Sequence, residues 1–525
     1  MTKAMTAETK VSEKKLFIVS WVILAAYSAL TLLGALNHEL WLDEAQAWVI
    51  LRDAPLSELP GILNTEGHPP LWYAILYPFV KLGSPAEHVS LISWFIMALG
   101  AVVLMFKVKL PLPLKAVILA SSGFLYLNSV MLRVYCLIPP LLFLILWIYP
   151  KRREHAVLYG LLIALLANTH VFICGIVGIL GIYMIYDLFA EWKNSPKNEN
   201  IGKLIGLAIA GVGVLILVIP LLGSIQANGA TDMSSGVVRN TFFETLDEVF
   251  AFSVFGNNQK LSIITFIFFL ILKVAFLAMI AVLRHWRRAF AVEIGFVAIY
   301  YVACGMIWTT LANRAVIFIL SLAFSFCLTQ FEKPIFKEYK MGDRIGGAIR
   351  AFLTHLIEFD KKAAKVYLVI LTAFFVITIP SGAVLLYRDI TSAFSGAEET
   401  AEYITENLED DAVLIDLNIG MPEISFYDPD IRIFSVYSCG FNSYACWKYA
   451  NRPRETVETV LRTLSEYDDL YIIYYYKGDD YQKSDTIFLA QGMREYDYHN
   501  SIAICKYNEE EIMFLFKYYD ELNRK

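Results

Sequence analysis

The chain has 525 residues, of which 57% are hydrophobic and 18% are charged, and its formal net charge is −6. Soluble domains carry about 25% charged residues, so the length and the shortage of charge exclude one large soluble core and indicate a protein with many membrane spans. The chain has neither a GxGxxG motif nor a Walker-type phosphate loop. Nucleotide binding therefore has no support in the sequence.

Eleven apolar segments are long enough to be predicted as transmembrane helices, since about 20 mostly apolar residues cross the hydrocarbon core. They are 16–36, 88–106, 114–131, 135–150, 155–171, 172–190, 204–222, 261–283, 289–310, 312–330 and 366–387. A twelfth segment, 71–83, is shorter, follows Pro69-Pro70 and contains Pro78. Taken alone, it could be a short span, a re-entrant segment or a juxtamembrane helix.

The placement of lysine and arginine decides between these alternatives, because cytoplasmic loops carry the excess of positive charge. If 71–83 does not cross and the N-terminus is cytoplasmic, the inner segments hold 24 of these residues and the outer loops before residue 388 hold six. The six are Arg52, Lys81, Arg133, Arg239, Lys260 and Arg314. We therefore predict that 71–83 lies at the outer face. The loop 223–260, where aromatic residues alternate with acids, predicts a second outer-face helix.

The composition changes after the last span, which divides the chain into a membrane module, 1–387, and a polar part, 388–525. Helical stretches at 397–408 and 454–467 alternate with strand-like runs at 412–417, 431–436, 470–476 and 501–507. This alternation predicts a small α/β domain. An odd number of spans places it outside the cell, on the same side as the loop 37–87.

Two acids, Asp43 and Glu44, directly follow the first span, and a His68-Pro69-Pro70 turn follows them. Acids at the start of a helix are favoured by its dipole, and proline suits a first helical turn. The functional alternative is a general base in an apolar setting beside Trp41 and Trp48. His68 could cap, orient or catalyse, and a metal role is weaker because no second His or Cys stands at ligand spacing nearby.

Four further polar residues are predicted at outer ends of spans: Arg133, Tyr135, His170 and Arg314. Each could be an interface anchor. An arginine at such a depth is costly unless it meets an anion, and its guanidinium suits phosphate. The charge pattern therefore predicts that these residues face the acidic loop, where two arginines would suit a lipid-phosphate donor.

These motifs resemble the GT-C glycosyltransferases, in particular the branch of the protein O-mannosyltransferases, the lipid A aminoarabinose transferase and the galacturonosyltransferases of the lipopolysaccharide core. The resemblance rests on Asp43-Glu44 after the first span and on His68-Pro69-Pro70-Leu71-x-Tyr73. It also rests on Arg133-Val134-Tyr135 and on the Asn168-Thr169-His170 corner. The Asn313-Arg314 corner matches less well, because position 315 is Ala rather than an aromatic residue.

The resemblance implies a mainly α, polytopic GT-C architecture and an inverting transfer of a hexose or pentose from a polyprenyl-phosphate donor to an envelope glycan, lipid or protein. It implies that Asp43 is the base, that Glu44 and His68 shape or assist the site, that Arg133 and Arg314 face the donor phosphate, and that Tyr73 and Tyr135 line the cavity. His170 stands at a corner that often carries a histidine in this family. A divalent cation is used by some members, and the sequence does not assign one here.

The expected location is the plasma membrane, with the N-terminus cytoplasmic and the C-terminal domain extracytoplasmic. The alternative, from a different functional class, is a transporter or flippase of lipids or sugars that has no transferase chemistry. Many spans with charges near a lumen would also suit a transporter. Against it, the sequence shows no internal repeat, and the charges are predicted at outer ends rather than at mid-depth, apart from Lys273 in the middle of 261–283, which the charge count does not explain.

Overall fold

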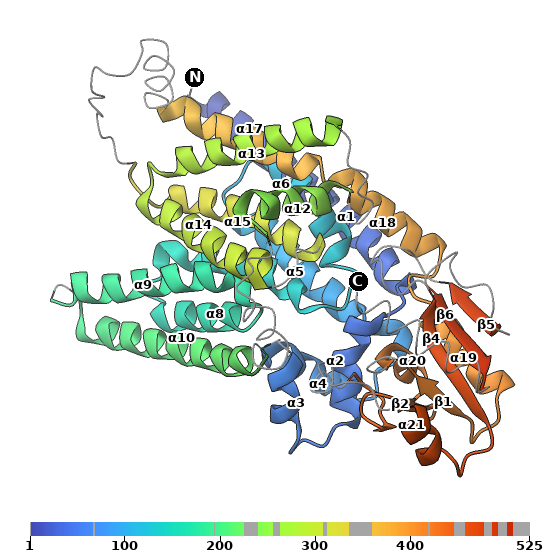
Figure 1. The fold of residues 1–525 in the computed structure, drawn as a ribbon. Helices are drawn as coiled ribbons and strands as arrows, with labels where there is room; N and C mark the ends of the chain where they lie inside the picture. The colour runs from blue at the N-terminus through green and yellow to red at the C-terminus, as the bar shows by residue number, and fades with distance from the viewer. Residues whose placement is uncertain are drawn as a thin grey trace.

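The computed structural model describes residues 2–66, 69–193, 195–224, 240–255, 263–307, 312–334, 360–417, 421–445, 457–476, 486–491 and 501–507. His68 lies outside these residues, so its predicted role in the site stays a prediction. The described chain forms a large helical bundle with a mixed sheet at one end, beside α2 and α20 (Figure 1).

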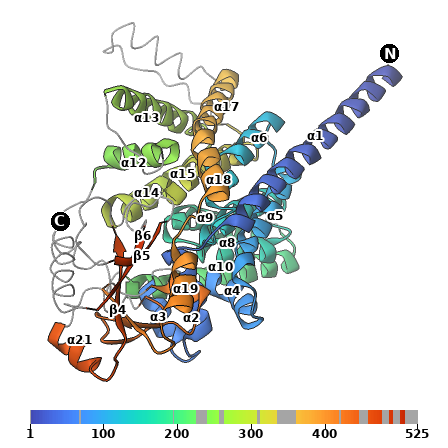
Figure 2. The same ribbon diagram turned by 90° about the vertical axis from the view of Figure 1, so that its right-hand side faces the viewer.

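Helices make up the membrane module. They are α1 (Thr2–Asn37), α2 (Leu42–Asp53), α3 (Leu59–Glu66), α4 (Leu71–Lys81), α5 (Leu91–Lys107), α6 (Leu112–Ala120), α7 (Ile138–Ile148), α8 (Ala156–Ala167), α9 (Cys174–Glu191), α10 (Lys197–Ser224), α12 (Phe242–Phe255), α13 (Ile263–Leu283), α14 (Arg287–Tyr300), α15 (Ala312–Thr329), α17 (Asp360–Val376) and α18 (Ile379–Thr391). Short 3-10 helices occur at Ala86–His88, Val134–Leu137, Tyr149–Lys151 and Val171–Ile173, and π-helical turns at Gly123–Leu127 and Tyr301–Ile307. Helix α1 projects away from the rest of the bundle (Figure 2).

Among the described residues, eight helical segments are long and apolar enough to cross a membrane, and they make this an integral membrane protein. Two more predicted spans coincide with shorter apolar helices, Leu91–Lys107 and Ala156–Ala167, and their crossing of the membrane stays a prediction. The 11 residues of α4 rise about 16 Å at 1.5 Å per residue, whereas the hydrocarbon core is about 30 Å thick. This helix is therefore too short to cross, as the charge placement predicted.

The prediction of one continuous span over 114–131 was wrong. Helix α6 ends at Ala120, and a π-helical turn follows at Gly123–Leu127. Serine hydroxyls bond to backbone carbonyls on both sides of the break, Ser121 to Ile118 and Ser129 to Phe124. Kinks commonly occur at such Gly and Ser positions. The break lets the chain turn toward the corner that carries Arg133.

Segments predicted to share the inner face do contact one another. The Arg288 guanidinium lies 3.3 Å from the Asp187 carboxylate, and that of Arg152 lies 2.7 Å from it. At the same end, the ammonium of Lys107 lies 5.0 Å from the ring centroid of Trp147. The structure therefore groups these basic segments at one end of the bundle. Which side of the membrane this end faces stays a prediction.

A charged residue in the middle of a predicted span is explained by helix α12. Lys273 lies halfway along α13, and its ammonium is 2.8 Å from the carboxylate of Asp247 on α12. Such residues in membrane helices usually pair with an opposite charge. Leu246, Val249 and Phe250 of α12 are buried in the bundle. This helix is thus a packed part of the bundle as well as the amphipathic helix predicted for this loop.

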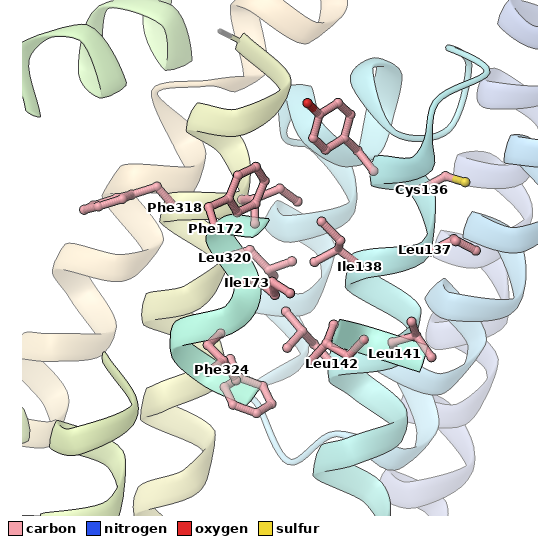
Figure 3. Packing of buried hydrophobic residues seen from close by; sticks show 14 of the residues in the cluster. Cys136, Leu137, Ile138, Leu141, Leu142, Phe172, Ile173, Phe318, Leu320 and Phe324 are labelled. Atoms are coloured by element: carbon pink, nitrogen blue, oxygen red, sulfur yellow. The ribbon is translucent and has the colours of Figure 1, made fainter. Parts of the chain in front are cut away.

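Aromatic and aliphatic side chains fill the centre of the bundle. Figure 3 shows this packing between the chain around Ile138, the corner at Phe172 and helix α15. Phe172, Ile138 and Phe318 are almost completely buried. The backbone turns that carry Tyr135 and His170 lie at this core, so tight packing holds these side chains in place.

Helices α8 and α10 approach each other at glycines, as small residues allow in membranes. A Cβ atom on Gly206 would overlap the carbonyl group of Ala156, whereas one on Gly202, in the same helix, would meet nothing within 4 Å. Overpacking costs about 1–3 kcal/mol. We expect Gly206→Ala to lower the midpoint of thermal unfolding in detergent and Gly202→Ala to leave it near the wild-type value. Equal midpoints for the two variants would contradict this packing.

The C-terminal part forms a six-stranded sheet of order β3-β2-β1-β4-β6-β5. Its elements are α19 (Ala397–Asn407), β1 (Val413–Asp416), α20 (Pro422–Tyr427), β2 (Arg432–Ser435), β3 (Gly440–Phe441), α21 (Val457–Thr463), β4 (Leu470–Tyr476), β5 (Thr486–Gln491) and β6 (Ser501–Lys506). Strand β1 is parallel to β2 and β4, and the other pairs are antiparallel. One face packs on α21 and the other on α19 and α20.

Candidate active site

Asp43 and Glu44 occupy the first turn of α2, the position that the helix dipole favours. Their side chains point to different surroundings. The Asp43 side chain is 35% exposed, whereas that of Glu44 is completely buried. Only Asp43 of the two can therefore meet a substrate without a rearrangement.

Asp43 forms an ion pair with Arg133, a residue 90 positions away in the sequence. Its Oδ2 accepts a hydrogen bond of 2.6 Å from Nη1 of Arg133. The guanidinium also lies 5.9 Å from the ring centroid of Trp41 and 5.6 Å from that of Tyr135. Burial would lower the pKa of Arg133, but the neighbouring Asp43 and Tyr135 outweigh it and the pKa is raised. Arg133 is thus held as a cation against a carboxylate that water can reach.

Three more predicted residues continue from this pair. Nε of Arg314 donates to the hydroxyl of Tyr135 at 3.2 Å, and the same hydroxyl lies 3.4 Å from Nε2 of His170. The Tyr135 and His170 rings stack with centroids 5.3 Å apart. The structure therefore brings Arg314, Tyr135 and His170 into contact with one another, and Tyr135 lies beside Arg133, which pairs with Asp43. Two guanidinium groups thus lie close to one tyrosine.

Glu44 belongs to a buried charge network that the sequence analysis missed. Its carboxylate lies 3.0 Å from Nε2 of His38, and Nδ1 of His38 lies 2.9 Å from Asp389. Burial lowers the pKa of His38, but the charges of Asp389 and Glu44 raise it more, so the pKa is well above its usual value. The available signals were the position of His38 directly after the first span and that of Asp389 near the end of the last span.

Tyr73 lies in the same region, on helix α4. Its hydroxyl donates to Glu66 at 3.5 Å. Burial, followed by the charge of Glu66, raises the pKa of Tyr73 well above its usual value, and Asp43 and Arg133 also act on it electrostatically. The predicted tyrosine is therefore brought close to the Asp43–Arg133 pair as a neutral phenol.

The C-terminal unit contacts the acidic loop directly. Gln46 of α2 exchanges two hydrogen bonds of 2.8 Å with the backbone of Ala445, and its amide also donates to Glu66. The hydroxyl of Tyr427 accepts a hydrogen bond from the backbone of Leu40 at 3.0 Å. The unit therefore holds both the start and the middle of the stretch that carries Asp43.

Glu423 of helix α20 extends this contact toward the site. The pKa of Glu423 is raised to about 7, mainly by burial; the hydrogen bond from Tyr475 lowers it in part, and the charges of Asp416 and Asp43 contribute to the rise. The hydroxyl of Tyr475 donates to its carboxyl group. The carboxyl group of Glu423, which belongs to the C-terminal unit, thus lies close enough to Asp43 for the two groups to interact electrostatically.

The described part of the chain shows no metal-binding site. No group of three or more His, Cys, Asp and Glu side chains is arranged there to hold an ion. His68, one of the predicted site residues, is not among the described residues.

The arrangement combines a partly exposed carboxylate with buried cations and phenols. A carboxylate beside a guanidinium is favoured in its ionised form, which can accept a proton. A guanidinium has five N–H donors in a planar fork, so one that contacts Asp43 can also bind phosphate oxygens. The site can therefore deprotonate a nucleophile and stabilise an anionic leaving group.

Comparisons with known proteins add two structures of similar shape. Neither a protein-family model nor a curated protein sequence matches this chain. The crystal structure of ArnT from Cupriavidus metallidurans bound to undecaprenyl phosphate has 12% identity and a TM-score of 0.47, and the match covers 93% of this chain and 97% of ArnT. For ArnT in the apo state the identity is 12%, the TM-score is 0.46, and the match covers 95% and 98% of the two chains.

Proposed function

We propose that this protein is a membrane glycosyltransferase that moves a sugar from a polyprenyl-phosphate donor to an envelope glycan, lipid or protein. The observation that carries the proposal is the 2.6 Å contact between the partly exposed carboxylate of Asp43 and the buried guanidinium of Arg133. Tyr135 and Arg314 continue from this contact. A proton acceptor thus stands beside groups suited to phosphate, at the end of a bundle that lies in lipid.

The proposed reaction is a single displacement at the anomeric carbon. Asp43 accepts the proton of the acceptor hydroxyl or amine as the acceptor atom bonds to that carbon. The bond between the anomeric carbon and the phosphate oxygen breaks, and its electron pair stays on the phosphate. Arg133 and Arg314 stabilise the polyprenyl phosphate that leaves. Attack from the face opposite the phosphate inverts the anomeric configuration.

The other predicted site residues are proposed to bind the sugar and to shape the cavity. Tyr73 and Tyr135 lie where they can line the cavity, because aromatic rings present both an apolar face and a hydroxyl to a sugar. His170 stacks on Tyr135 and orients its hydroxyl toward Arg314. His68 is proposed to assist the site from the turn before α4. The external face and the plasma membrane remain the proposed location, with the C-terminal unit on the same side as Asp43.

The experiment that tests the proposal separates transfer from transport. Purified protein in liposomes is given polyprenyl phosphate carrying radiolabelled mannose, galacturonic acid or aminoarabinose, together with an envelope extract as acceptor. We expect one donor to lose its label to the extract and to leave polyprenyl phosphate. A labelled lipid that crosses the bilayer unchanged would instead identify a flippase. A lipid that neither reacts nor moves would contradict both functions.

A further inference from the structure

The most unusual buried group outside the proposed chemistry is His38, which lies between two carboxylates. Its Nε2 is 3.0 Å from Glu44 and its Nδ1 is 2.9 Å from Asp389, and all three side chains are completely buried. Both ring nitrogens can donate only when the imidazole is protonated. A buried ionic cluster is costly to desolvate, so it is weak evidence for added stability. Such a cluster can instead hold the groups around it in one geometry.

Glu44 connects this cluster to the backbone that carries Arg133. One oxygen of its carboxylate accepts the N–H of Leu132 at 2.5 Å. Its other oxygen lies 3.0 Å from Nε2 of His38, and the same ring nitrogen is 3.1 Å from the first oxygen. The carboxylate is therefore bonded to His38 and to the Leu132 backbone at the same time, and it also accepts the N–H of Trp41 at 3.5 Å.

Two adjacent contacts then join α2 to this corner of the chain. Asp43 binds the side chain of Arg133, and Glu44 binds the backbone of Leu132. Asp43 and Glu44, which are adjacent on α2, thus hold the adjacent residues Arg133 and Leu132. Two such contacts fix both the distance and the rotation of the corner relative to α2. A single ion pair between a half-exposed aspartate and a long arginine side chain would fix neither.

Asp389 connects the same cluster to the end of the last membrane helix. It lies on α18, which ends at Thr391, shortly before α19 of the C-terminal unit begins at Ala397. The ring of Phe394, between these helices, packs against the ring of His38 with centroids 5.0 Å apart. His38 thus contacts the end of α1, the start of α2 and the connection to the C-terminal unit.

We propose that His38 is a positioning residue: it orients Glu44 so that Glu44 holds the Leu132 backbone and places Arg133 against Asp43. The positioning role itself does not depend on the proposed function. Only its expected effect on the rate of sugar transfer rests on that function. It assigns Glu44 an indirect role, because a completely buried side chain with these bonds does not touch a substrate. It also assigns Asp389 the task of orienting the His38 ring.

The first test measures the position directly and needs no substrate. Hydrogen exchange followed by mass spectrometry reports the protection of peptides that contain the Leu132 amide, in the purified full-length protein. An amide left without its buried acceptor should exchange about ten- to a hundredfold faster. We expect this acceleration in His38→Ala and in Glu44→Ala, with no change in peptides from α9. Unchanged protection of Leu132 in either variant would overturn the proposal.

A conservative variant distinguishes geometry from charge. In Glu44→Gln the amide oxygen can still accept the Leu132 N–H, and the amide nitrogen can donate to a neutral His38 that donates to Asp389. Leu132 should therefore stay protected in this variant, which also covers the case in which His38→Ala fails to fold. Loss of protection in Glu44→Gln equal to that in Glu44→Ala would contradict the positioning role.

The second test uses transfer from the labelled donor lipid as the readout. His38→Ala and Glu44→Ala should each lower kcat about ten- to a hundredfold, and the double variant should be no slower than Glu44→Ala, because His38 acts through Glu44. Additive losses would overturn that dependence. If the wild-type protein transfers no sugar, the proposed function fails while the hydrogen-exchange result still decides the positioning role.

Discussion

Replacing Asp43 with asparagine is expected to slow sugar transfer by about 10²- to 10⁴-fold, the range that a positioned general base contributes. Asparagine has nearly the same shape, and its amide oxygen can still accept the hydrogen bond that Arg133 now gives to the carboxylate. It cannot take the proton of an acceptor hydroxyl. The loss should therefore appear in kcat, while the affinity for the lipid-linked donor stays near the wild-type value.

The measurement is an initial rate in liposomes with the labelled donor, beside a direct binding assay for the same lipid. Asp53→Asn is the matched control, because Asp53 lies at the other end of α2 and pairs with the neighbouring Arg52. This variant removes one carboxylate from the same helix and should transfer sugar at nearly the wild-type rate. Transfer by Asp43→Asn at the rate of this control would contradict the assignment of the base.

Much of the architecture follows from local patterns in the sequence. Apolar runs predict the membrane helices because a span must satisfy its backbone internally. The strands at 413–416 and 470–476 occur where short β-branched and aromatic runs predicted them. The break after Ala120 was missed, because it depends on how Ser and Gly positions pack against other helices and not on hydropathy. Strand β3 was missed because it has only two residues, Gly440 and Phe441.

The candidate site, too, could be predicted from the sequence only in part. Asp43, Arg133, Tyr135, His170 and Arg314 could be placed together because the charge count puts their loops at one end of the bundle, and the structure brings them into one group of contacts. The sequence did not separate the roles of Asp43 and Glu44, because neighbouring acids look alike until burial is known. Nor could it find the contact of His38 with Asp389, which joins residues 351 positions apart.

Arg133→Ala is expected to lower kcat/KM for the lipid-linked donor by about 10²- to 10³-fold, the cost of removing one preorganised donor to a developing negative charge. In contrast to Asp43→Asn, this variant should also bind the donor lipid more weakly, because the guanidinium is proposed to contact the phosphate before and after the sugar leaves. Arg133→Lys keeps the charge without the planar fork and should retain part of the activity. Arg52→Ala, which removes a more exposed arginine from α2, is the matched control.

The comparison of these two variants tests the division of labour between the paired residues. If Arg133 only held Asp43 in place, Arg133→Ala would lower kcat as Asp43→Asn does and leave donor binding unchanged. If Arg133 binds the phosphate, polyprenyl phosphate without a sugar should inhibit the wild-type protein and Asp43→Asn alike but lose affinity for Arg133→Ala. Equal inhibitor affinity in all three proteins would remove Arg133 from the proposed phosphate site. Arg314, whose guanidinium reaches the same tyrosine from the opposite helix, would then be the remaining candidate for that contact.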